Sequence, residues 1–430
     1  MYSQRLNRAA QLFAAGEYVA ASQLYDQLTH EPNATGDAWF GQGCTLQALG
    51  QVEPAEAAYR QAILLGTPSI ASVWFNLGNL LRGIGRYPEA DSAYRFALAF
   101  RPDHAGARFG LAKTDLVQGA WVRGWANYES RWQGVIMSPS ERARRANLLA
   151  AGPEWLGEPL AGKRLLVYPE QGAGDTFQFL RFLPLLRSRG AQVVLSAEPN
   201  SRSLLVASQL CGANELAGGQ IRITGHTPLM SLPHRLGIDD ERGLHSPPYL
   251  FAPADAQARW SAQLADAPGL KVGLVWAGNP EHANDANRSM PLAVLTQLLH
   301  CPNVTWVSLQ KPTPVADLQA LADSPQIRRY GEQLGDYGDT AGLMANLDLV
   351  IGVDTSVVHL AGAMGKPVWI MLTKVPEWRW QLARQDSPWY PSARLFRQTS
   401  AGDWGELLQR VGQALAGLSS AGAPALNPPR

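Results

Sequence analysis

The chain has 430 residues, which is too long for one compact domain and indicates two or three. Apolar residues make up 46% of the chain and charged residues 17%, so a sizeable core is available and the composition argues against long-range disorder. The 37 basic and 36 acidic residues leave a formal net charge of +1, which gives no support for an extended nucleic-acid surface.

The cysteines and the N-terminus predict a cytoplasmic protein. Cys44, Cys211 and Cys301 are far apart and lack metal-ligand spacing, which argues against a disulfide framework or a zinc site. The first residues show no apolar run of signal-peptide type. No stretch approaches the roughly 18 uninterrupted apolar residues that a membrane span needs. A reducing compartment fits this pattern best.

A repeated pattern occupies residues 1–132. Four glycines recur at intervals of 34 or 35 residues, and four tyrosines keep the same intervals. These residues are Gly16, Gly50, Gly85 and Gly119, with Tyr25, Tyr59, Tyr94 and Tyr128. The pattern resembles the tetratricopeptide repeat, in which each unit is an antiparallel helix pair and neighbouring pairs stack to bury their apolar faces. The second and third units match this repeat fully. The first and fourth units match it less well and resemble the terminal units of an array.

The resemblance predicts that a protein partner binds the concave face of the array, where extended peptides usually dock. Asn76 and Asn79 lie on the first helix of the third unit. They are candidates for hydrogen bonds to the backbone of an acceptor peptide. Ordinary solvated polar residues are the alternative interpretation for both.

After the repeats, residues 133–162 contain several Pro, Gly and Ser residues and are predicted to form a linker. The chain then changes to alternating strands and helices. Strands are predicted at residues 164–168, 192–196, 271–276, 303–308, 347–351 and 367–371. Helices are predicted over 176–189 and from about Ser356. Two parallel sheets in tandem follow from this order, and ligands of such sheets bind beyond the carboxyl ends of the strands.

The segment after the strand at 347–351 is a candidate phosphate site. Asp354, Thr355 and Ser356 open a helix there, so free backbone N–H groups and two hydroxyls are available to one anion. His359, one turn further, is a candidate donor to the same anion. The alternative is that one of the first three residues only caps the helix.

The counterpart in the first sheet is the segment from Gln171 to Asp175. Gly172 and Gly174 allow another molecule to approach the backbone, and Asp175 is a candidate general base that points into a cleft. A capping role for Asp175 is the alternative. A dinucleotide-binding fingerprint fits poorly because its third glycine and its ribose carboxylate are missing.

Two more loops carry candidate ligand-binding groups. Gly278, Asn279 and Arg288 follow the strand at 271–276, and Arg288 stays charged and can bind a diphosphate in a forked geometry. A surface arginine is the alternative there. Gln310 and Lys311 follow the strand at 303–308 at the same sheet edge. The aromatic run over residues 378–390 either stacks on a base or sugar or packs the two lobes together.

Together these features resemble the heptosyltransferase family of GT-B glycosyltransferases over about residues 163–417. Asp175 looks like the acidic residue of that family's N-lobe, which is proposed as the base. The segment from Asp354 to His359 looks like the family's Asp-Thr-Gly-x-x-His donor-phosphate motif, with Ser356 in place of the glycine. Arg288 stands roughly where the family uses a basic residue. Repeats fused to such a domain also resemble protein O-glycosyltransferases, including bacterial flagellin-modifying enzymes and O-GlcNAc transferases.

The resemblance implies a multi-domain chain, an all-α tetratricopeptide superhelix followed by an α/β GT-B fold of two Rossmann-like lobes. It places the acceptor lobe at 163–262, the nucleotide-sugar lobe at 263–417 and a disordered tail at 418–430. It further implies an inverting glycosyltransferase that needs no metal and no cofactor besides a nucleotide-sugar co-substrate. The expected acceptor is a Ser or Thr hydroxyl of a protein held by the repeats. Two alternatives stay open: a non-catalytic scaffold with a degenerate or sensory domain, and a transferase acting on lipopolysaccharide or another glycan.

Overall fold

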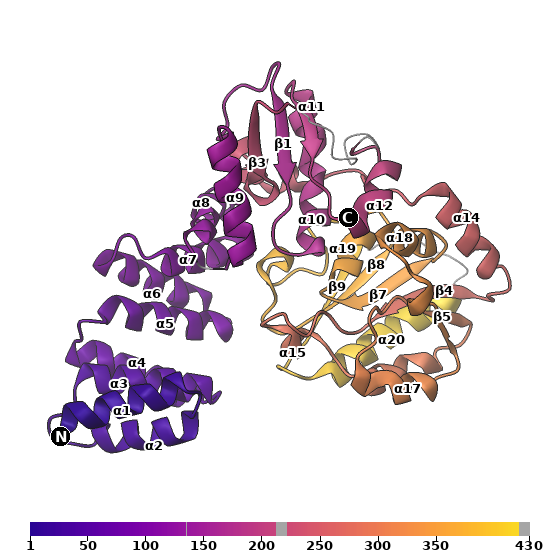
Figure 1. Ribbon diagram of the computed structural model, residues 1–430. Helices are drawn as coiled ribbons and strands as arrows, with labels where there is room; N and C mark the ends of the chain where they lie inside the picture. The colour runs from indigo at the N-terminus through magenta and orange to yellow at the C-terminus, as the bar shows by residue number, and fades with distance from the viewer. Residues whose placement is uncertain (135, 212–221, 421–430) are drawn as a thin grey trace. The chain divides into compact units, whose positions relative to one another are not determined.

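The computed structural model describes residues 1–134, 136–211 and 222–420 (Figure 1). The chain divides into two units, Met1–Met137 and Ser138–Arg430. In the described part of the chain, no helix combines the length and the apolar character that crossing a membrane requires.

The first unit is all-helical. Its helices are α1 Tyr2–Ala14, α2 Tyr18–Thr29, α3 Gly36–Ala48, α4 Val52–Leu65, α5 Ile70–Gly83, α6 Tyr87–Phe100, α7 Ala105–Val117 and α8 Trp121–Tyr128. Consecutive helices pack in pairs. The turns within the four pairs each contain one of the glycines that recur in the sequence, and all four have φ between 74° and 81°, a left-handed backbone that favours glycine. The helical repeat that the spacing predicts is therefore confirmed.

The recurring tyrosines explain why glycine also stands inside several helices. Tyr94 of α6 is fully buried. A Cβ atom added at Gly78 of α5 or Gly110 of α7 would lie 2.7 Å or 2.4 Å from its ring. The missing side chains of these two glycines therefore leave the space that the Tyr94 ring fills between neighbouring repeats.

We expect Gly110→Ala to destabilise the first unit by about 2 kcal/mol, because the new methyl group forces the Tyr94 ring out of its position. Gly83→Ala is the matched control, since nothing lies within 4 Å of the added Cβ at this exposed end of α5. The control should be neutral or stabilising by up to about 1 kcal/mol. Urea unfolding of both variants measures the difference, and equal stabilities would contradict the steric explanation.

The second unit contains two parallel sheets (Figure 1). The first has the order β2-β1-β3, with β1 Arg164–Tyr168, β2 Gln192–Leu195 and β3 Gly225–Pro228. The strands predicted at 164–168 and 192–196 are confirmed. Strand β3 was not predicted, because its sequence Gly-His-Thr-Pro has no apolar pattern although all four residues are buried.

The second sheet has the order β6-β5-β4-β7-β8-β9, and all its strand pairs are parallel. Its strands are β4 Leu270–Val275, β5 Val304–Ser308, β6 Ile327–Arg329, β7 Leu349–Val353, β8 Val368–Leu372 and β9 Ala393–Arg397. The four predicted strands are β4, β5, β7 and β8. Chain order runs outward from β4 on one side and from β7 on the other, so the topological switch point lies between β4 and β7.

Helices of different lengths flank the sheets. They are α9 Pro139–Ala151, α10 Ala173–Phe179, α11 Leu183–Ser188, α12 Arg202–Ala207, α13 Leu232–Leu236, α14 Ala254–Gln263, α15 Asp285–Arg288, α16 Leu292–Leu295, α17 Leu318–Ala322, α18 Tyr337–Ala345, α19 Ser356–Ala363 and α20 Trp404–Ser420. The helix predicted over 176–189 is divided into α10 and α11 because Pro184 stands in the first turn of α11. Helix α20 runs into the predicted tail at 418–430, of which residues 421–430 lie outside the described residues.

The predicted linker at 133–162 contains α9, and its residues from Ser138 onward belong to the second unit. Ser138 and Glu141 form a capping box: the Ser138 hydroxyl accepts from the Glu141 N–H at 3.2 Å, and Glu141 accepts from the Ser138 N–H at 2.8 Å. The Ser-Pro-Ser run that suggested a loop is therefore a helix start with proline in the first turn. The Gln171 N–H donates to the Glu141 carboxylate at 2.6 Å, which fixes α9 beside the first sheet.

Candidate functional site

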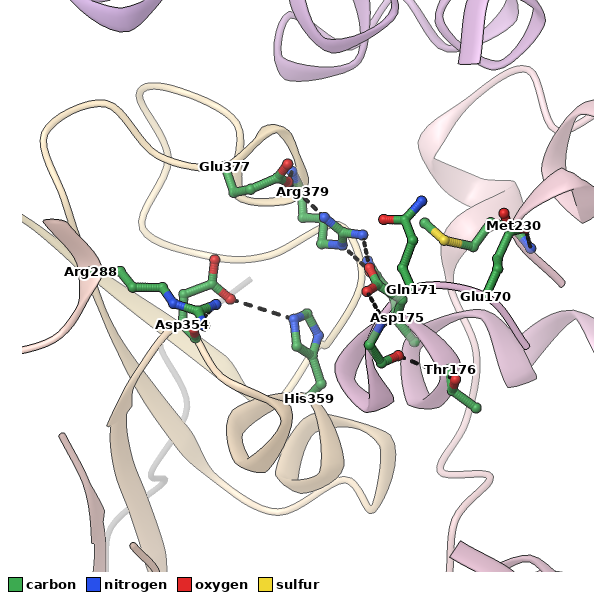
Figure 2. Close-up of polar contacts among 12 residues, drawn as sticks. Glu170, Gln171, Asp175, Thr176, Met230, Arg288, Asp354, His359, Glu377 and Arg379 are labelled. Atoms are coloured by element: carbon green, nitrogen blue, oxygen red, sulfur yellow. Dashed lines mark hydrogen bonds and ion pairs between the residues drawn. The ribbon is translucent and has the colours of Figure 1, made fainter. Parts of the chain in front are cut away.

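Candidate residues from two distant loops meet at the switch point of the second sheet. Arg288 follows β4, and Asp354 follows β7. The Arg288 side chain lies beside Asp354 (Figure 2), and its Nη1 donates to the Asp354 carbonyl at 3.0 Å. The Arg288 Nε donates to the Asp285 carboxylate at 3.0 Å. A Cβ atom at Gly278 would lie 2.5 Å from Arg288, so this glycine leaves room for the guanidinium. The structure thus brings together two of the segments on which the phosphate-site prediction rests.

Asp354 and His359 interact at the start of α19. The His359 Nε2 lies 3.5 Å from the Asp354 carboxylate, and its Nδ1 lies 2.9 Å from the Tyr390 hydroxyl. The His359 ring also stacks on Trp380, with ring centroids 5.1 Å apart. Burial by itself raises the pKa of the Asp354 carboxyl, but the hydrogen bond and charge of His359 hold this pKa below its ordinary value. Asp354 is therefore an anion at neutral pH, and its imidazole partner has a fixed orientation.

Two hydroxyls lie at the N-terminus of α19. Thr355 precedes the helix, is only 8% exposed, and its Oγ1 has no hydrogen-bond partner among the described residues. The Ser356 Oγ lies 3.1 Å from the Tyr337 hydroxyl. Thr355 therefore does not cap the helix with its side chain, which removes one of the alternatives for this residue. A buried hydroxyl without a partner costs about 1–3 kcal/mol, a cost that a ligand oxygen can offset.

Helix α10 of the first sheet packs against α19 of the second (Figure 1). A Cβ atom at Gly174 would lie 2.9 Å from the His359 ring and 3.4 Å from the Ser356 Cα. The sequence predicted that Gly174 lets another molecule approach the backbone. In the structure, the missing side chain of Gly174 instead allows α19 of the same chain to pack closely.

Asp175 points toward the second sheet from the first turn of α10 (Figure 2). One carboxylate oxygen accepts from the Gly172 N–H at 2.9 Å, which is the capping role that the sequence analysis left open. The other oxygen is hydrogen-bonded to the guanidinium of Arg379. The candidate base is thus engaged on both oxygens in this structure.

Arg379 is a charged residue of the site that the sequence analysis did not single out. It lies in the loop after β8, with a side chain that is only 8% exposed. Besides Asp175 it contacts Gln178 of α10, at 2.6 Å from Nε, and Glu377, at 2.7 Å from Nη1. Its only sequence signal is its place between two tryptophans of the aromatic run, and its partner Asp175 lies 204 residues away in the chain.

The remaining candidates on the second sheet have structural contacts. The Gln310 side chain accepts from the backbone N–H groups of Trp276 and Ala277 at 3.1 and 3.0 Å. It donates to two carbonyls at 3.0 Å, so its amide is fully used within the protein. The Lys311 ammonium is bonded to the Leu334 carbonyl. The Asn279 side chain accepts from the Glu281 N–H at 3.1 Å. Gln310 therefore stabilises the loop after β4 and has no amide group left to bind a ligand.

A pocket of about 690 Å³ lies at the carboxyl ends of β1 and β2. Gln171 and Gly172 line it together with the start of α10, and Glu141 and Arg144 of α9 form another part of its wall. Glu170, a buried carboxylate that accepts from the Met230 N–H at 3.0 Å, also borders it (Figure 2). Its lining is mixed, with carboxylates and hydroxyls beside aliphatic groups of similar extent. Thr176, the neighbour of Asp175, reaches the same pocket.

The two asparagines of the first unit contact residues of their own array. The Asn76 amide donates to the Cys44 thiol at 3.2 Å, and the Asn79 side-chain oxygen accepts from the Tyr94 hydroxyl at 2.8 Å. Both are half-buried. Each thus connects neighbouring helices, so neither the peptide-binding role nor the solvated role describes its main contact. Within the described residues, no three His, Cys, Asp or Glu side chains group so as to hold a metal ion.

Comparison with known proteins defines the class of the first unit. The family model described as tetratricopeptide repeat matches residues 40–91 and 75–123, which cover most of the second repeat, the third and part of the fourth. The chain therefore has tetratricopeptide repeats in its N-terminal region, followed by a region of parallel sheets.

Over most of its length the chain is similar to Protein FlbA of Caulobacter vibrioides, with 29% identity over 352 residues. The match covers 73% of this chain and 55% of the relative, so the chain spans about half the length of that protein. Among solved structures, MamA is 15% identical over 34% of this chain and 81% of its own, with a TM-score of 0.29. YrrB, described as a TPR protein with an unusual peptide-binding site, is 17% identical over 29% of this chain and 64% of its own, with a TM-score of 0.27.

Proposed function

We propose that the second unit is an inverting, metal-independent glycosyltransferase of the GT-B type that uses a nucleotide-sugar donor. The observation that carries this proposal is the meeting of Arg288, the start of α19 and Asp175 where the two sheets approach each other. The acceptor lobe would be residues 163–262, extended by α9, and the donor lobe residues 263–417.

The donor's diphosphate would bind at the start of α19. The first N–H groups of a helix have no partner within it, and they carry partial positive charge. Arg288 adds a fixed cation, and the buried Thr355 hydroxyl adds a donor without a partner among the described residues. These groups would stabilise the negative charge that grows on the leaving phosphate in the transition state.

Asp175 would act as the base. It would take the proton of an acceptor hydroxyl while the acceptor oxygen forms a bond to the anomeric carbon of the sugar. The bond between that carbon and the donor's phosphate oxygen breaks with inversion, and the nucleoside diphosphate leaves with the electron pair. The pocket beside Thr176 supports an acceptor on this side, since its hydroxyls and carboxylates suit a polar substrate.

The acceptor would be a Ser or Thr of a protein bound by the repeats. Tetratricopeptide arrays bind peptides, and a bound acceptor raises the effective concentration of its hydroxyls near the second unit. Cytoplasmic localisation stays a prediction in this proposal; the structure gives Cys44 and Cys301 as free thiols.

A non-catalytic sensor of nucleotide sugars is the second candidate. The observation in its favour is that both carboxylate oxygens of Asp175 are occupied, by the Gly172 N–H and by Arg379. A sensor keeps such a pair closed, whereas an enzyme must open it in every turnover.

A thermal-shift screen of the full chain with uridine, guanosine, adenosine and cytidine diphosphates tests the proposal. We expect one of them to raise the unfolding midpoint selectively, since a ligand at 100 times its Kd stabilises by about 2.7 kcal/mol. Arg288→Gln should remove the response, and Arg242→Gln, at an exposed arginine that pairs only with Asp240 among the contacts seen, should preserve it. Radiolabelled nucleotide sugar of the same base then shows whether label reaches a protein, a glycan or nothing. No midpoint shift with any diphosphate contradicts the proposed function.

A further inference from the structure

Arg379 is the cation that joins α10 to the loop after β8. Its guanidinium contacts Asp175 of α10 and Glu377 on its own loop (Figure 2). It also contacts Gln178 of α10. It also lies over the Trp378 ring, at 4.3 Å from the centroid. Three polar groups and an aromatic face thus hold a side chain that is almost completely buried.

The same cation lies beside the proposed donor site. Its charge is one of the influences that lower the pKa of Asp354, the residue whose carbonyl holds Arg288. The neighbouring residue Trp380 stacks on His359. Arg379 is therefore between the candidate base on one side and the proposed phosphate-binding groups on the other.

We infer that Arg379 pairs with Asp175 only while the donor is absent, and that it exchanges this carboxylate for the donor's diphosphate. The inference rests on the proposed function and adds a donor-binding residue and an order of events to it. A diphosphate carries more negative charge than one carboxylate and accepts the forked guanidinium equally well. Glu377 remains bonded to Arg379 in both states and keeps the guanidinium in place.

The exchange makes base and donor interdependent. Asp175 is bound by the guanidinium until the donor arrives, so the base becomes available only when there is a sugar to transfer. Since the two anions compete for one cation, their binding is negatively coupled, and such coupling works equally in both directions. Loss of the Asp175 charge should therefore tighten diphosphate binding, and it should do so through Arg379.

A double-mutant cycle on the full chain tests this. Isothermal titration calorimetry measures the Kd of the four nucleoside diphosphates for the wild type, Asp175→Asn, Arg379→Gln and the double variant. We expect Asp175→Asn to tighten binding about tenfold and Arg379→Gln to weaken it by a similar factor. In the Arg379→Gln background, Asp175→Asn should change the Kd less than about twofold.

The matched control is Asp336→Asn. Asp336 also links the two sheets, through the Ser203 hydroxyl, but has no contact with Arg379. Its replacement should leave the Kd unchanged. Arg379→Lys keeps the positive charge but lacks the forked N–H donors of the guanidinium. Its Kd for the diphosphate should lie between those of the wild type and Arg379→Gln, which separates a binding role from a folding defect.

Two results overturn the inference while leaving the proposed function intact. The first is an Asp175→Asn variant whose Kd equals that of the wild type, a result that needs no Arg379 variant to fold. The second is equal tightening by Asp175→Asn with and without Arg379, which reduces the effect to general charge repulsion. If the wild type binds none of the four diphosphates, the proposed function fails and the inference fails with it.

Discussion

Replacing Asp175 with Asn is expected to lower sugar transfer by about 10²–10⁴-fold, the usual contribution of a general base. Asparagine keeps the size of the side chain and can still accept a hydrogen bond from the Gly172 N–H, which the carboxylate accepts at 2.9 Å in the wild type. It cannot take a proton from an acceptor hydroxyl. Single-turnover transfer of labelled sugar, at donor concentrations well above the Kd, measures the loss in the chemical step.

Two controls test whether the loss of transfer comes from the loss of the general base. Donor binding must be retained in Asp175→Asn, so that the loss of transfer is not a loss of substrate. Asp336→Asn, which removes a carboxylate elsewhere between the sheets, should transfer at the wild-type rate. Near-normal turnover by Asp175→Asn would eliminate this residue as the base, whereas donor binding without any transfer by the wild type would favour the sensor.

Replacing Glu154 with Gln is expected to destabilise the second unit by about 3 kcal/mol, the typical result of removing one partner from a buried ion pair. Glu154 follows α9 and is bonded to Arg145 of α9 at 2.7 Å and to Arg235 at 2.6 Å. The Glu154 and Arg235 side chains are only 7% and 3% exposed, so the arginine would lose its carboxylate in a nearly dry site. Urea unfolding measures the loss, and hydrogen exchange should show faster opening of α9.

The effect of Glu154→Gln should depend on pH with a defined sign. Burial raises the pKa of the Glu154 carboxyl, but the hydrogen bonds and charges of Arg235 and Arg145 hold this pKa below the ordinary value of about 4.3. The carboxylate therefore stabilises the fold fully above that ordinary value, and the contribution disappears as the pH falls through the lower, folded-state pKa. The difference between wild type and variant should shrink in the same window.

Glu406→Gln is the matched control for the ion pair. Glu406 pairs with Arg410 one turn along α20, but both side chains are more than a third exposed. Water and salt screen such a pair, so its loss should barely change the unfolding midpoint. Equal effects of the two substitutions would show that burial does not decide the strength of the Glu154 pair.

The sequence by itself determined the elements whose signals are local. The period of Gly16, Gly50, Gly85 and Gly119 predicted the helix pairs, because a left-handed turn and a buried ring recur in every unit. Continuous apolar runs predicted six strands of the two sheets. Strands β3, β6 and β9 escaped prediction because they are short or carry polar residues, and the Ser-Pro-Ser start of α9 was interpreted as a loop.

The tertiary structure alone decided which site residues contact one another. The strand order places the loops after β4 and β7 side by side, so Arg288 meets Asp354 across 66 residues of chain. Gln310 and Arg379 both follow buried strands, and no local pattern distinguishes them. Packing gives Gln310 a structural role and pairs Arg379 with Asp175. Hydrogen bonds and ion pairs depend on which chain segments share a sheet edge, whereas helix period and turn conformation are encoded within a few neighbouring residues.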